Sequence, residues 1–131
     1  MTNNINKLIL MILCTILIVF PISTLALREP LITGGTTETR TYIKEYLTNT
    51  NTTQYVKTIT LKNYQSKYYD AYAWYNTKTI HLYQQTWTEP TKLHNILRHE
   101  LGHLIAEAQH QNTYNYNYNE WQADNIAEGL P

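Results

Sequence analysis

The sequence has 131 residues, and its ten Lys and Arg balance its ten Asp and Glu. This neutral balance, with no basic face and no acidic run, argues against a nucleic-acid partner. The single cysteine, Cys14, lies in an apolar N-terminal segment, so the rest of the chain can form neither a disulfide nor a thiolate metal site. Tyr and Thr are abundant and favour strands, which predicts a β-containing domain.

Residues 8–27 form an uncharged apolar run, LILMILCTILIVFPISTLAL. A helix of about twenty apolar residues can span a bilayer, but residues 8–20 also fit the shorter apolar centre of a signal peptide. Residues 1–27 are therefore predicted to be either a signal peptide or a transmembrane anchor. Lys7 favours the cytoplasmic side, so both alternatives place the remaining chain outside the cytoplasm, membrane-anchored or secreted.

Residues 28–35 contain a proline and two adjacent glycines and are predicted to be a linker, which leaves residues 36–131 as one domain. Roughly 100 residues suffice for one small core. Apolar residues at helical spacing predict a first helix from Thr36 or Thr37 to about Thr48. Alternating apolar residues then predict three strands, the last two paired as a hairpin: residues 54–61, 68–75 and 79–83.

A long helix is predicted next, from a cap at Thr88 to about His110. Pro90 lies in its first turn, where proline is tolerated. A final short helix is predicted from about Asn119 to Ala127. The expected fold class is therefore α+β, with an N-terminal helix, a small three-stranded sheet, a long helix and a short closing helix.

The strongest functional signal is HELGH at residues 99–103, in the middle of the long predicted helix. His99 and His103 share one face of that helix, so their imidazoles can bind one ion. Glu100 is close enough to reach a water on that ion without binding the ion itself. Zinc in such a site acidifies the water, and Glu100 is expected to act as the general base. The alternative is a pair of surface histidines in an ordinary helix.

Catalytic zinc takes three protein ligands and keeps a fourth position open, so a third ligand must come from elsewhere. Metzincins place another histidine six residues after the second one, but Gln109 occupies that position here. Glu120 on the final predicted helix is the candidate ligand, and Asp124 on the same face can orient His99 by a hydrogen bond. The alternatives are an acid favoured by the helix N-terminus for Glu120 and a solvated acid for Asp124.

HELGH followed by Glu120-x-x-Ala123-Asp124 resembles the gluzincins, the thermolysin-like clan of zinc peptidases. The tail from Glu120 to Leu130-Pro131 is also similar to the ImmA/IrrE-type peptidases, and the small size is similar to that of the minimal gluzincins. The resemblance implies a zincin-like fold, zinc (Zn2+) as the cofactor, Glu120 as its third ligand and hydrolysis of peptide bonds in an extended polypeptide substrate. It also implies that Asp124 is the partner of a ligand histidine.

The larger gluzincins stabilise the transition state with a histidine from a further subdomain. Thermolysin-like enzymes also place a tyrosine between the second histidine and the glutamate ligand, and Tyr114, Tyr116 and Tyr118 occupy that interval here. We predict that Tyr114 is the catalytic oxyanion donor. The alternative is that all three are loop aromatics packed on the surface.

Three functions remain open at this point. The first is a zinc metalloendopeptidase whose edge strand, expected at residues 79–83, binds the substrate through its main chain. The second is a catalytically inactive zinc-binding interaction module tethered to a membrane. The third is a membrane protein in which the motif is fortuitous. Glu100 favours the first, because a binding module needs no base.

Overall fold

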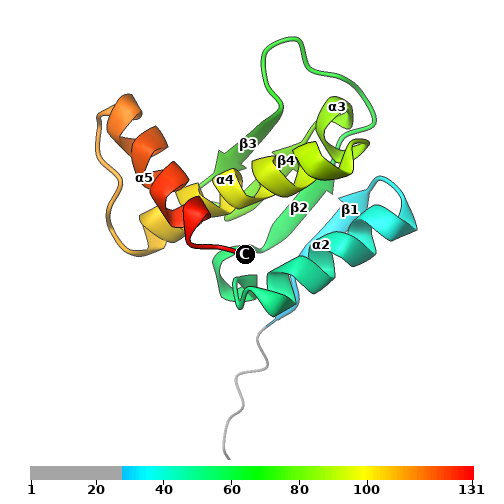
Figure 1. The fold of residues 1–131 in the computed structure, drawn as a ribbon, viewed down its shortest axis with the longest axis horizontal. Helices are drawn as coiled ribbons and strands as arrows, with labels where there is room; N and C mark the ends of the chain where they lie inside the picture. The colour runs from blue at the N-terminus through cyan, green and yellow to red at the C-terminus, as the bar shows by residue number, and fades with distance from the viewer. Residues whose placement is uncertain (1–27) are drawn as a thin grey trace, which may run out of the picture.

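The computed structural model describes residues 28–131, which form an α+β fold with a small four-stranded sheet (Figure 1). In chain order the elements are β1 (Leu31–Gly34), α2 (Thr37–Asn49), the 3-10 turn η1 (Thr53–Tyr55), β2 (Thr58–Leu61), β3 (Ala71–Trp74), β4 (Thr79–Leu82), α3 (Gln84–Trp87), α4 (Pro90–Ala108) and α5 (Tyr116–Glu128). The predicted signal peptide or anchor at residues 1–27 lies outside this part. Among residues 28–131, no helix is long and apolar enough to cross a bilayer.

The sheet has the strand order β1-β2-β4-β3, and only β3 runs antiparallel to its neighbour. The predicted hairpin is present as β3 and β4. The expectation of three strands is wrong, because residues 31–34, inside the predicted linker, pair with β2 as β1. β1 is mostly exposed, so its sequence carries no alternation of apolar and polar residues that would have revealed it.

The expected edge strand is also wrong. β4, which holds His81, lies between β2 and β3 and is therefore interior, whereas β3 has a free edge. The order of strands in a sheet depends on long-range pairing, which the alternation within one strand does not specify. Any segment that adds to the sheet beside the long helix must therefore pair with β3.

Two helix starts differ from the prediction in ways that affect the site. Thr88 is the C-cap of α3, so the N-cap of α4 is Glu89. α5 begins three residues earlier than expected, because the side chain of Asn115 accepts a hydrogen bond from the backbone N–H of Tyr118 at 3.2 Å. Tyr116 therefore belongs to the first turn of α5 rather than to a loop.

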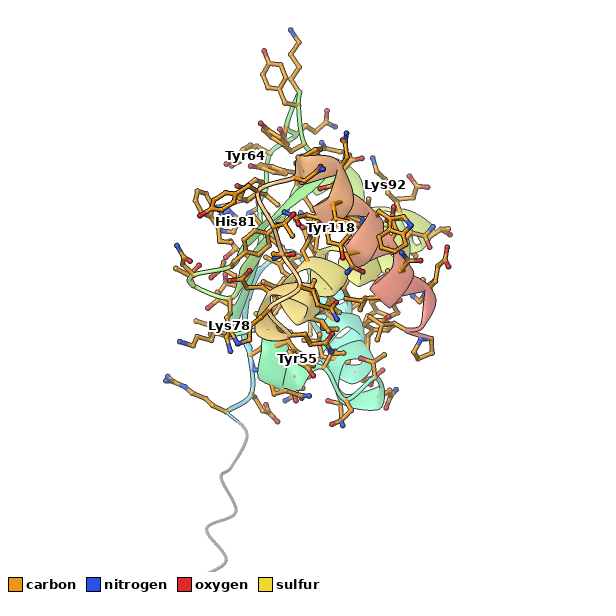
Figure 2. The ribbon with its side chains drawn as sticks, turned by 90° about the vertical axis from the view of Figure 1, so that its left-hand side faces the viewer. Tyr55, Tyr64, Lys78, His81, Lys92 and Tyr118 are labelled. Carbon is orange, nitrogen blue, oxygen red and sulfur yellow. The ribbon has the colours of Figure 1, made fainter. Side chains whose placement is uncertain are left out.

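Helices α2 and α4 cover one face of the sheet, and α5 crosses the second half of α4 (Figure 1). Their apolar side chains meet the inward side chains of the strands in one core, whose fully buried members are Ile43, Leu47, Ile59, Ile80, Leu82, Leu97 and Leu101. His81 lies on the opposite side of the sheet, away from the helices (Figure 2). The fold thus anchors α4 firmly and leaves the other sheet face open.

Candidate metal centre

The three predicted metal ligands come together where α4 meets α5. The Nε2 atoms of His99 and His103 lie 3.1 Å apart. Glu120, from the first half of α5, brings one carboxylate oxygen within 3.3 Å of His99 Nε2 and the other within 3.3 Å of His103 Nε2. Among residues 28–131, these side chains form the group that can hold a metal ion.

The spacing of these atoms fits a small tetrahedral ion. Bonds of about 2.05 Å at the tetrahedral angle place two ligand atoms about 3.3 Å apart. The two Nε2 atoms lie 3.1 Å apart, and each lies 3.3 Å from a different oxygen of Glu120. Burial, assisted by the nearby His99, lowers the pKa of His103, which favours the neutral ring that binds metals. The group offers two imidazole nitrogens and one carboxylate as electron-pair donors. A divalent cation can bind all three donors at once.

The close crossing of α4 and α5 depends on Gly102, the fourth residue of HELGH. A Cβ at this position would lie 2.3 Å from the carbonyl oxygen of Ala123 and 2.9 Å from its carbonyl carbon. Ala123 is itself fully buried. Arg98 Nη2 and Nε donate to the carbonyl of Ala127 at 2.6 and 3.1 Å, which holds the far end of α5. The small residues Gly102 and Ala123, together with the hydrogen bonds from Arg98, therefore bring Glu120 close to the histidines.

The sequence analysis assigned no role to Gly102, although a glycine inside a predicted helix is itself a signal. A glycine inside a helix costs about 1 kcal/mol relative to alanine, so its presence there usually has a packing or functional reason. The partner helix that supplies this reason, however, is known only from the tertiary structure.

Asp124 orients His99 in the structure. His99 Nδ1 and Asp124 Oδ1 lie 2.8 Å apart, and a carboxylate oxygen can only accept this hydrogen bond. The Nδ1–H tautomer leaves the Nε2 lone pair free to face His103 and Glu120. Asp124 lies four residues after Glu120, so one turn of α5 supplies both the candidate third ligand and the acid that orients His99.

We expect Asp124→Asn to lower the zinc affinity about 10- to 100-fold, because an amide holds the His99 ring and its tautomer less well than a carboxylate. A competitive chelator titration measures the affinity. Glu128→Gln, which removes the same charge from an exposed position on the same helix, is the control and should leave the affinity unchanged. Equal affinities of the two variants would exclude the orienting role.

Tyr75 is a site residue that sequence reasoning missed. Its hydroxyl lies 3.4 Å from His103 Nδ1, in the position to accept a hydrogen bond from that ring. Burial first, and then the charges of Glu120 and Glu100, raise the pKa of Tyr75 to about 12, so the phenol stays protonated. Tyr75 follows β3 directly, and its sequence position indicated only a strand residue.

Glu100 lies in the wall of a cavity of about 590 Å³ that the metal ligands share. Its side chain is almost completely buried, and this burial raises its pKa to about 7, against the opposing effects of His99 and of a hydrogen bond from the backbone of Ala73. A dication next to the carboxyl group acts in the opposite direction and lowers its pKa. Glu100 is thus a carboxyl group with a proton affinity near the neutral range, facing the cavity rather than solvent.

The three tyrosines within residues 114–118 have different surroundings in the structure. Tyr114, the predicted oxyanion donor, lines the cavity with a fully exposed side chain. Tyr116, whose side chain is also exposed, lines the same cavity, and the nearby charge of Glu120 raises the pKa of Tyr116. Tyr118 points elsewhere, because its hydroxyl accepts a hydrogen bond from Gln122 at 2.8 Å. Of the three tyrosines, Tyr116 is therefore the one that lines the cavity and whose pKa responds to the charge of Glu120.

Comparisons with family models, with curated proteins and with solved structures find no match to this chain.

Proposed function

We propose that this chain is a zinc-dependent endopeptidase of the gluzincin type with a zincin-like fold. The observation that carries the proposal is the pair of Nε2 atoms 3.1 Å apart, each 3.3 Å from a different oxygen of the Glu120 carboxylate. The buried Glu100 lies next to this group. Nitrogen and oxygen donors in a site of this size favour zinc over magnesium or calcium. The membrane or extracytoplasmic location remains a proposal that rests on residues 8–27.

The roles of the chain's own residues follow from their positions. When bound, zinc supplies a Lewis acid that polarises a carbonyl and acidifies water. Glu100 would accept a proton from the attacking water and return it to the departing amine, since its buried carboxyl group lines the cavity where both would lie. His99 and His103 would hold the ion, and hydrogen bonds with Asp124 and Tyr75 fix the orientation of the two rings.

An extended polypeptide is the substrate class that the surroundings of the site support. Ala71 and Ala73 of β3 line the same cavity as Glu100. β3 has a free edge, where an added strand can form main-chain hydrogen bonds. A peptide bound along this edge passes the metal centre, because β3 packs against α4.

We assign the oxyanion donor to Tyr116 rather than to Tyr114. Tyr116→Phe should lower kcat about 100-fold, since removal of one donor to the developing oxyanion has this order of effect. Tyr114→Phe, at a fully exposed neighbour, is the matched control and should change kcat little. Zinc content is measured in both variants, because the charge of Glu120, a proposed ligand, acts on Tyr116. A larger loss in Tyr114→Phe would return the role to that residue.

Metal removal tests the proposed function itself. The full-length chain should bind one zinc ion and cleave an unfolded protein, lose the cleavage when a chelator removes the ion, and regain it with stoichiometric zinc. Zinc should also raise the melting temperature, because an ion that binds only the folded state stabilises it. Zinc binding without cleavage would support the inactive interaction module, and the lack of stoichiometric zinc would show that the motif is fortuitous.

A further inference from the structure

A row of exposed aromatic side chains runs along β3 and the loop before it. Ring centroids lie 6.4 Å apart for Tyr68 and Tyr69, 6.2 Å for Tyr69 and Tyr72, and 4.9 Å for Tyr72 and Trp74. Each of these side chains is 43–78 % exposed. Large aromatic side chains gathered in one exposed row are typical of a binding surface rather than of a core.

The row is separate from the core but continuous with the cavity. Along β3, Ala71 and Ala73 are buried toward α4, whereas Tyr72 and Trp74 alternate with them and point to the open face of the sheet. Tyr69 and Tyr72 nevertheless line the cavity that contains Glu100. The two middle members of the row therefore border the proposed active site, and Tyr68 and Trp74 extend the row to either side of it.

Only one flank of Tyr72 and Trp74 is occupied by the sheet. On the β4 side they are paired with His81 and Thr79, and Figure 2 shows His81 on this open side of the sheet. The other flank faces the free edge. A peptide strand added there would place every second side chain next to these two rings, at the short spacing of cross-strand neighbours.

The alternation then divides the side chains of the peptide between two environments. One set points to the open face, toward Tyr72 and Trp74, where aromatic cross-strand pairs are favourable. The other set points toward the metal centre. There the cavity is lined by Glu100, Glu120 and the two histidines, so this set of side chains lies beside polar groups rather than aromatic rings.

We propose that the site selects extended peptides with aromatic side chains at alternate positions, and that Tyr72 and Trp74 determine this specificity. This inference rests on the proposed function, because the selected peptide is the proposed substrate. Two ring contacts should raise the affinity about 10-fold over a peptide that makes one. The positions of the aromatic side chains in the peptide would then set its register along β3.

The test uses two labelled peptides of identical composition, one with Phe at alternate positions and one with two adjacent Phe. Fluorescence anisotropy measures their binding to the full-length Glu100→Gln chain loaded with zinc, which should not cleave them. The alternating peptide should bind about 10-fold more tightly, since adjacent side chains point to opposite faces. Tyr72→Thr/Trp74→Thr, which keeps residues that favour strands, should remove the preference.

The control is Tyr64→Ala, because Tyr64 is an exposed tyrosine that packs on Tyr83 and does not line the cavity. It should leave both affinities unchanged. Equal binding of the two peptides, or a preference that survives in Tyr72→Thr/Trp74→Thr, would overturn the inference. Hydrolysis by the unsubstituted chain is measured separately. Cleavage of both peptides without preference overturns the inference alone, whereas selective binding without cleavage overturns the peptidase and leaves the peptide specificity standing.

Discussion

Glu100→Gln is expected to lower kcat for peptide hydrolysis by about 10²- to 10⁴-fold, the usual contribution of a general base. The amide has nearly the same shape but does not accept a proton from water. Since Glu100 is not one of the three ligands, the zinc content should remain unchanged. The measurements are single-substrate kinetics and metal analysis of the same preparation.

The position of Glu100 makes this substitution a clean test. Its carboxyl group is buried, and it faces the cavity beside His99 and Ala73. Burial raises the pKa of Glu100, so loss of its charge removes a desolvation cost and should not unfold the chain. Glu45→Gln, at an exposed acid on α2, is the control for the loss of one charge. Full activity in Glu100→Gln would remove the residue from the mechanism.

Gly102→Ala is expected to destroy the metal centre. In an isolated helix this change stabilises by up to about 1 kcal/mol, but here the added Cβ lies 2.3 Å from the carbonyl oxygen of Ala123. Overpacking of this kind costs about 1–3 kcal/mol, and the backbone of α5 must move to relieve it. Because Glu120 and Asp124 lie on that helix, one displacement removes both the third ligand and the acid that orients His99.

We therefore expect at least a 100-fold loss of zinc affinity together with a lower melting temperature. Gly129→Ala is the matched control, since a Cβ at Gly129 makes only an ordinary contact of 3.4 Å with the carbonyl oxygen of Ile126. This variant should keep its zinc and its stability, or gain slightly through the lower entropy of the unfolded chain. Wild-type zinc affinity in Gly102→Ala would show that the helix crossing does not position Glu120.

The sequence by itself determined the features that depend on neighbouring residues along the chain. The spacing of His99 and His103 places both rings on one helix face, and the same spacing couples Glu120 with Asp124. The α+β class and the β3–β4 hairpin follow from local periodicity and a short turn, and both are confirmed. These properties are set by helix and strand geometry, which repeats every few residues.

Only the tertiary structure decided which segments meet. It showed that residues 31–34 join the sheet and that β3, not β4, has the free edge beside α4. It also brought Ala123 against Gly102 and the hydroxyl of Tyr75 to His103. Contacts between residues far apart in the chain depend on how all the elements pack around one core, and no local pattern of amino acids specifies that arrangement.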